Sequence, residues 1–158
     1  QVANFASSMA EKLRKQRSVS GEMVVFAYTN RFKETQPQTY LNALVSFTTP
    51  TSDQRTIVSR AVSATKLMFK NGYGYKKAGV IASKIIPEGE VMHSLFEDTA
   101  ATEREHKITS TLDAINSTFG KGTIKLAVQG RGKIKTASDN QSPHYTTKWS
   151  DIPKVTVK

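Results

Sequence analysis

The sequence contains no cysteine, which excludes disulfides, thiolate metal sites and cysteine nucleophiles from its 158 residues. It also lacks an apolar run near the roughly 20 residues that a membrane-spanning helix needs, and its N-terminus does not resemble a signal peptide. We therefore expect no membrane partner and a cytoplasmic location. The chain opens on Gln1 instead of a methionine, so we expect a processed chain or a piece of a longer protein.

Acidic residues are missing from one long stretch. Residues 54–87 contain seven Lys and Arg and no Asp or Glu, whereas residues 88–105 contain six acids and one Arg. The net charge is +10, from 23 Lys and Arg against 13 Asp and Glu. Segregated basic charge favours a polyanionic partner, most commonly nucleic acid. The alternative, a basic surface that only improves solubility, would spread its charge evenly.

Residue patterns of common catalytic and metal sites are sparse. The glycines of NGYGYKKAGV (residues 71–80) follow a predicted helix and precede a predicted strand, the reverse of a phosphate-binding loop. GKGT at residues 120–123 lacks the first glycine of a P-loop, and SPHY at residues 142–145 is not a nucleophile elbow. We expect neither a catalytic site nor a zinc site, because the three histidines are dispersed: His93, His106 and His144.

Hydrophobic periodicity predicts two helices and three strands in the first 88 residues. One helix covers about residues 2–15 and is broken by residues 18–21; the other starts at an N-cap at Thr51 or Ser52 and stops at Gly72. Strand-forming residues predict three strands, of which the first two form a hairpin, at residues 22–30, 40–48 and 75–86.

A further helix and strand are predicted near the C-terminus. TERE at residues 102–105 is a capping-box pattern, and apolar residues continue at helical spacing until Gly120. Alternating apolar residues then predict a strand over residues 124–128.

The element order resembles the little finger of Y-family translesion DNA polymerases. Short sequence motifs support a resemblance to their bacterial UmuC branch. LVSFTTPTSD (residues 44–53) resembles that branch's strand-to-helix joint, YKKAGV (residues 75–80) its last strand, and MHSLF (residues 92–96) occupies the place of its clamp-binding pentapeptide. LDAIN (residues 112–116) and SPHYTTKW (residues 142–149) resemble the C-terminal extension of the same branch.

This resemblance implies an α+β fold in which helices pack on one face of a mixed sheet. The family's first strand is missing, which would leave an open sheet edge. We expect a little-finger DNA-binding domain at residues 1–88, an acidic linker with the clamp-binding-like motif at residues 89–104, and a small helix-strand extension of the UmuC type at residues 105–158.

The implied function is non-specific grip on template-primer DNA by part of an error-prone polymerase, in DNA repair, SOS mutagenesis and UV protection. Eight residues are expected to bind DNA, and strand alternation allows only one of the two adjacent lysines on the open sheet face: Lys76, Lys77, Lys84, Arg31, Lys33, Asn42, Ser46 and Thr48. The resemblance assigns five residues to the sliding clamp: Met92, His93, Ser94, Leu95 and Phe96. Met92 stands where such peptides usually carry glutamine, which should weaken that contact.

The resemblance also has implications for catalytic activity, cofactors and partners. The palm and fingers, with their metal-binding carboxylates, belong to the full-length polymerase, so we expect no activity and no cofactor in this chain; Mg²⁺ would serve the full-length enzyme. The implied partners are duplex primer-template DNA, the sliding clamp, a UmuD-like subunit and the recombinase filament, in the bacterial nucleoid. Two other hypotheses remain open: a protein-interaction module that docks the clamp or UmuD-like partners, and an unrelated basic protein that binds RNA.

Overall fold

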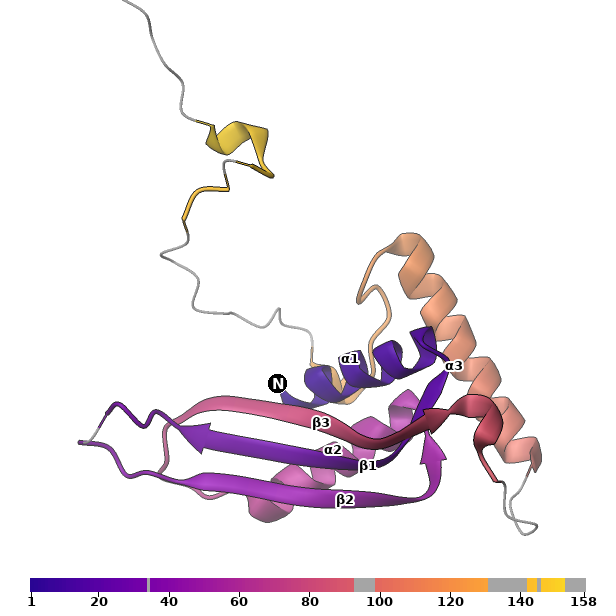
Figure 1. The fold of residues 1–158 in the computed structure, drawn as a ribbon, viewed down its shortest axis with the longest axis horizontal. Coiled ribbons are helices and arrows are strands. Elements are labelled where there is room, and N and C mark those ends of the chain that lie inside the picture. Colours follow the sequence, from indigo (N-terminus) through magenta and orange to yellow (C-terminus); the bar gives the residue numbers. More distant parts are fainter. Residues whose placement is uncertain (34, 93–98, 131–141, 145, 153–158) are drawn as a thin grey trace, which may run out of the picture.

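A computed structural model describes residues 1–33, 35–92, 99–130, 142–144 and 146–152. Its first half follows the predicted order of helix, strand, strand, helix and strand (Figure 1). The elements are α1 (Val2–Lys15), β1 (Ser18–Thr29), β2 (Tyr40–Thr51), α2 (Gln54–Met68), β3 (Tyr75–Pro87), η1 (Glu88–Glu90), α3 (Thr99–Phe119), η2 (Ala127–Gln129) and η3 (Trp149–Asp151). The α+β class and the little-finger-like arrangement are therefore confirmed.

The three strands form one sheet in the order β2-β1-β3. The central strand β1 pairs antiparallel with both neighbours, so the described sheet is antiparallel throughout and not mixed as expected. Strands β2 and β3 do run parallel to one another, because helix α2 crosses over between them. They are not neighbours, however, since β1 lies between them.

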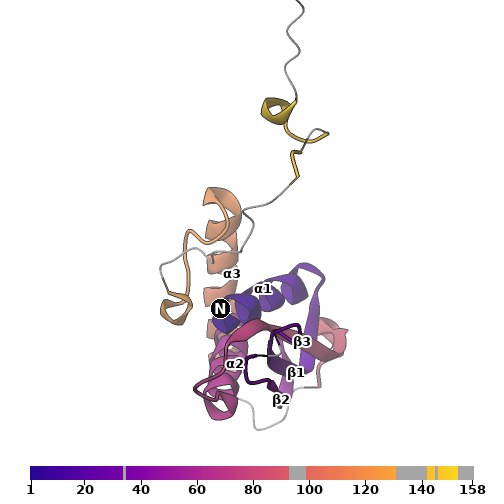
Figure 2. The ribbon, with the colours of Figure 1, turned by 90° about the vertical axis from the view of Figure 1, so that its left-hand side faces the viewer.

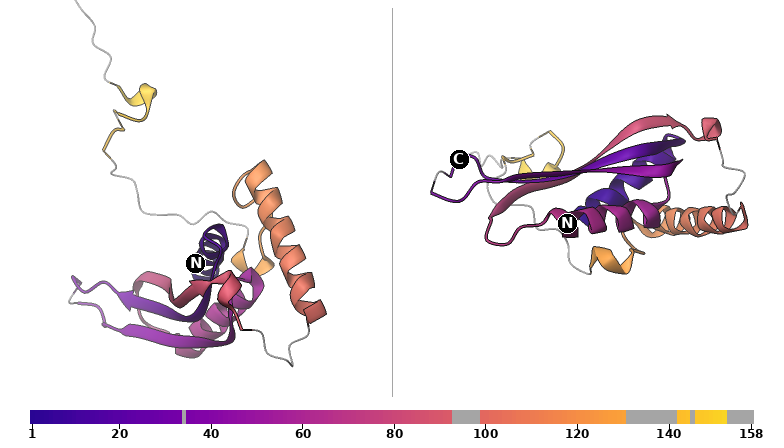
Figure 3. Two further views of the ribbon diagram at one scale, coloured as in Figure 1. Left: turned by 45° about the vertical axis from the view of Figure 1, so that its right-hand side comes forward. Right: turned by 90° about the horizontal axis from the view of Figure 1, so that it is seen from below.

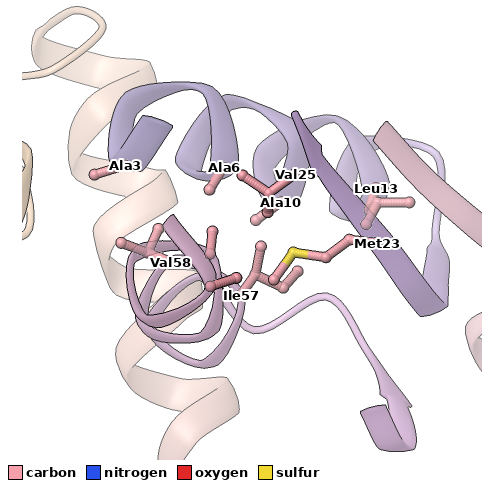
Figure 4. Packing of buried hydrophobic residues seen from close by; sticks show 10 residues of the cluster. Ala3, Ala6, Ala10, Leu13, Met23, Val25, Ile57 and Val58 are labelled. Atoms are coloured by element: carbon pink, nitrogen blue, oxygen red, sulfur yellow. The ribbon is translucent and has the colours of Figure 1, made fainter. Parts of the chain in front are cut away.

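Both α1 and α2 pack on the same face of this sheet (Figure 3, right). Strand alternation points Met23 and Val25 of β1 toward the helices, where both are fully buried. Figure 4 shows them beside Ile57 of α2 and the small residues of α1. Alanines at the contact let the helix axes approach closely. The hydrophobic core thus lies entirely on one side of the sheet.

Several boundaries in this half differ from the sequence prediction, and one of them is the end of β2, which continues to Thr51 instead of residue 48. Strand β1 begins at Ser18 and not at Glu22, because the Ser20 hydroxyl is satisfied inside the sheet by donating to the carbonyls of Glu22 and Ser83. The N-cap of α2 is Asp53, whose Oδ2 accepts from the Thr56 N–H at 2.7 Å. Helix α2 already ends at Met68, and Gly72 (φ +86°) lies in the following turn.

The C-terminal region keeps the predicted helix but not the predicted strand. Helix α3 begins at Thr99, so Thr102 is inside the helix and not at its cap. Residues 124–128 contain no strand; the backbone turns into η2 after Leu126. Leu126 packs against the core cluster, and its N–H is satisfied by the Gln129 side chain at 2.8 Å, which a single turn achieves without a neighbouring strand.

Helix α3 lies beside α1 (Figure 2) and is joined to the helical layer by side-chain contacts. Arg14 of α1 donates from Nε and Nη2 to the two carboxylate oxygens of Asp113, at 2.6 and 2.8 Å, and from Nη1 to the Ser52 carbonyl at 2.7 Å. The Arg14 side chain is only 16% exposed. Such a two-point ion pair fixes distance and orientation together.

We call the contact of Arg14 with Asp113 and Ser52 the joint, and a second contact supports it. While one oxygen of Asp53 caps α2, the other accepts from the hydroxyl of Thr109 at 3.0 Å, and Thr109 is buried. Polar contacts with named partners therefore hold α3 to both α1 and the start of α2.

The core makes a first prediction. Ile57→Ala removes buried methyl groups and should lower the free energy of unfolding by about 2–5 kcal/mol, measured by urea denaturation. The matched control is Leu67→Ala on the same helix, where the side chain is 90% exposed and the change should stay within about 0.5 kcal/mol. Equal losses for the two variants would contradict this position of the core.

The joint makes a second prediction. A double-mutant cycle of Arg14→Gln and Asp113→Asn should give a coupling energy of about 1–3 kcal/mol, because both bonds join charged groups. Hydrogen exchange of the α3 amides should accelerate in either single variant. Lys12→Gln, which changes an exposed residue of α1 outside this joint, is the control and should leave α3 unchanged. Zero coupling would mean that the ion pair does not hold the helix.

Candidate nucleic-acid interface

The second face of the sheet is turned away from α1 and α2, and no described helix packs on it (Figure 3, right). Strand pairing arranges its side chains in cross-strand rows spaced roughly 7 Å apart along the strands. We call these residues the uncovered face. Its four rows are Tyr40, Tyr28 and Lys77; Asn42, Phe26 and Gly79; Leu44, Val24 and Ile81; and Ser46, Glu22 and Ser83.

Aromatic rings occupy one end of the uncovered face. The ring centroids of Phe26 and Tyr28 are 6.1 Å apart with nearly parallel planes, and those of Tyr28 and Tyr40 are 6.3 Å apart. The Phe26 ring extends over Gly79 of the neighbouring strand: a Cβ at Gly79 would lie 2.6 Å from Phe26 Cζ. A glycine is required there because any side chain would displace the ring.

The two adjacent lysines take different positions, as strand alternation predicts. Lys77 pairs with Tyr28 and therefore lies on the uncovered face, whereas Lys76 falls where the pairing of β1 with β3 shifts register. Both side chains are exposed. The hairpin loop beyond the aromatic end of the face adds two more exposed cations, Arg31 and Lys33.

The predicted hydrogen-bonding residues of β2 share this face. Asn42 and Ser46 are exposed members of its rows, and Thr48 follows at the next exposed position of the strand. The structure therefore places Lys77, Asn42 and Ser46 on one face of the sheet. Lys77 is in the first row and Ser46 in the fourth, and Lys76 is next to Lys77 on β3.

Lys84 differs from the other predicted cations because it is already paired. Its Nζ lies 2.7 Å from Glu22 Oε1, and Ser46 also donates to that oxygen at 3.4 Å. Glu22 was missed by the sequence reasoning, although it is the single acid in β1 and alternates with Val24, Phe26 and Tyr28 onto the same face. The Glu22 carboxylate thus neutralises the non-aromatic end of the uncovered face.

A separate polar hollow lies between α1, α3 and the segment that follows α3. Its lining includes Glu11, which has an ion pair with Lys15 at 2.7 Å and a second with Lys121 at 3.6 Å. The hydrogen bond from Lys15 is the main reason that the pKa of Glu11 lies below its usual value. The lining also includes Lys125 and Asp113, so three lysines stand against two acids, and Asp113 is already paired with Arg14.

The described residues do not gather into a metal site, since no three His, Asp or Glu side chains among them lie close enough to hold an ion. Nor is any described helix long and apolar enough to cross a membrane. Of the five residues assigned to the clamp, only Met92 is described, and it is 86% exposed; residues 93–96 lie outside the described residues.

Comparison with known proteins agrees with the resemblance seen in the sequence. Residues 1–95 match the impB/mucB/samB family C-terminal domain, and residues 106–155 match a domain of unknown function, DUF4113. The second match covers most of α3, so the joint at Arg14 and Asp113 connects the two matched regions.

Three curated relatives illustrate the extent of the similarity. Protein SamB of Salmonella typhimurium is 36% identical over 155 residues, which cover 96% of this chain and 36% of the relative. Protein UmuC of Salmonella typhimurium is 33% identical over 155 residues, 98% of this chain and 37% of the relative. DNA polymerase IV of Desulfatibacillum aliphaticivorans is 30% identical over 84 residues, 52% of this chain and 21% of the relative.

The chain therefore spans a little over a third of the length of the first two relatives. The family domain covers more than half of the chain itself. The chain belongs to the impB/mucB/samB family, and its first 95 residues are that family's C-terminal domain.

Proposed function

We propose that this chain is the DNA-binding C-terminal part of an error-prone translesion polymerase of the UmuC type, which acts in DNA repair and SOS mutagenesis in the bacterial cytoplasm. The observation that carries the proposal is the uncovered face, on which Lys77 lies in one surface with Asn42 and Ser46. The net charge of +10 and the relatives named UmuC and DNA polymerase IV support it.

The proposed chemistry is a grip on the phosphate backbone of template-primer DNA. Lys76 and Lys77 supply positive charge, and the amide or hydroxyl groups of Asn42, Ser46 and Thr48 supply hydrogen bonds. Contacts with phosphates position a duplex without reading its bases. This suits a polymerase that must hold damaged DNA at any sequence.

The first test is the salt dependence of binding to a primer-template duplex. If about three phosphates are neutralised, the log-log slope of affinity against salt should be near −2.7, and binding should not depend on sequence. Lys76→Glu with Lys77→Glu should weaken binding to every sequence alike, measured by fluorescence anisotropy.

The matched control reverses the same number of charges on the helical side, through Arg60→Glu with Lys66→Glu. Both residues belong to α2 and are exposed. A flat salt dependence would overturn the proposal, as would equal losses in the two double variants. An RNA hairpin of equal length, used as competitor, tests the RNA-binding alternative; stronger binding to the hairpin would favour that hypothesis.

Glu22 makes an independent prediction, because it is an anion within the proposed interface and holds Lys84 at 2.7 Å. Glu22→Gln should tighten DNA binding. The salt slope should become steeper by about 0.9 if the released Lys84 gains one phosphate.

The control is Glu90→Gln, which changes net charge equally but lies beyond the end of β3, in η1. It should change neither affinity nor slope appreciably. If Glu90→Gln and Glu22→Gln behave alike, affinity follows net charge and the uncovered face is not the interface.

A second candidate function is docking of the replicative sliding clamp through residues 92–96, beside the other proposed partners, a UmuD-like subunit and the recombinase filament. Met92, the one residue of this segment that the structure describes, is exposed, which supports the candidate function. Two apolar side chains at the end of such a motif give binding in the micromolar range once ordering costs are included.

Restoring glutamine should strengthen the contact, so Met92→Gln should lower the dissociation constant for the cognate clamp in isothermal titration calorimetry. Leu95→Ala with Phe96→Ala should abolish the heat of binding while leaving the thermal midpoint of the chain unchanged. Absence of binding by both the wild type and Met92→Gln would leave this segment as a linker only.

A further inference from the structure

The aromatic end of the uncovered face has no role in the core. Phe26 and Tyr28 point away from α1 and α2, while the buried cluster is built from the alternate positions Met23 and Val25. Tyr40 is 54% exposed and is not part of the buried core cluster. Three neighbouring rings on the solvent side of a sheet indicate a surface that binds something with an apolar, flat shape.

Phosphate contacts do not explain these rings. A paired duplex presents phosphates and the edges of its bases, and the faces of the bases are hidden by stacking within the helix. Aromatic side chains stack well on bases only where the bases are unpaired and accessible. The rings therefore fit unpaired bases. Lysines that contact phosphates would not by themselves distinguish unpaired from paired nucleic acid.

The charge around the rings favours nucleic acid over an apolar protein partner. Lys77 is the direct cross-strand neighbour of Tyr28, and Lys76 is next to it on β3. Arg31 and Lys33 lie in the loop that continues from the same end of the hairpin. A row of rings bordered by cations matches the two features of a single strand, flat bases and a repeating anion.

We propose that Phe26, Tyr28 and Tyr40 form a stacking platform for unpaired bases of single-stranded DNA, such as a template overhang. The inference rests on the proposed function, since it assumes that the uncovered face meets DNA. Gly79 is part of the platform because its missing side chain lets the Phe26 ring lie across β3. The platform adds base stacking to the phosphate contacts. The uncovered face would then bind the unpaired part of the template as well as the paired part.

The test measures binding of the full chain to a labelled oligothymidylate of about 12 nucleotides, a length within the range of known single-strand sites. A hairpin duplex with the same label is measured in parallel at the same salt concentration. Tyr28→Ala and Phe26→Ala should each weaken binding of the single strand by about 5- to 150-fold, the range found when a stacking residue is removed. Duplex binding should change much less.

Two matched variants separate stacking from loss of apolar surface. Leu44→Ala removes a side chain on the same face that is 62% exposed but has no ring, and it should leave single-strand binding nearly unchanged. Gly79→Ala keeps every aromatic residue but displaces the Phe26 ring, and it should weaken single-strand binding. Since Tyr40 is largely exposed, Tyr40→Ala provides a further variant that should fold normally, checked by circular dichroism.

The outcomes distinguish the inference from the proposed function. If the wild type binds neither the single strand nor the duplex, the proposed function itself fails. If the duplex binds in a Lys77-dependent manner while the aromatic variants bind oligothymidylate as the wild type does, the stacking platform alone is wrong. An equal loss for Leu44→Ala and Phe26→Ala would also overturn it.

Discussion

The structure depends on the alternation of side chains along the central strand β1 from Glu22 to Tyr28. Because neighbouring residues point to opposite faces, Met23 and Val25 build the core, and Val24, Phe26 and Tyr28 are left for the other side. Both helices then pack on the face that carries the core, since only there can they bury their apolar sides. The same constraint that stabilises the domain therefore leaves an ordered surface free for a partner.

The joint between α1 and α3 extends this arrangement into the region matched by the domain of unknown function. Arg14 connects Asp113 with the Ser52 carbonyl, and Asp53 connects the cap of α2 with Thr109. These contacts are on the helical side, so α3 can support the helical layer without covering the sheet. Helix α3 thereby gains a structural role on the side of the domain opposite the proposed DNA interface.

Much of the fold follows from sequence because its main signals are local. The alternation of Leu41, Ala43, Val45 and Phe47 and the helical spacing around Ile57 were sufficient to order the elements. Features set by tertiary contacts were not predictable. Asp53 accepts a second hydrogen bond from Thr109, which lies far along the sequence, and Leu126 packs against a core built by other elements. At the candidate site, alternation allowed only one of the adjacent lysines on the face, but the pairing of Lys84 with Glu22 requires a register that local sequence does not reveal.

The central claim is that DNA contacts the sheet and not the helices. Because the chain has no cysteine, single cysteines can carry a short photo-crosslinker at Ser46 on the uncovered face or at Ser63, which is exposed on α2. The measurement is the yield of covalent adduct with a primer-template carrying a single-stranded overhang, at fixed salt and with both variants folded. The account predicts a high yield from Ser46→Cys, reduced by unlabelled DNA, and little from Ser63→Cys. Equal yields, or a higher yield from the helical position, would contradict it.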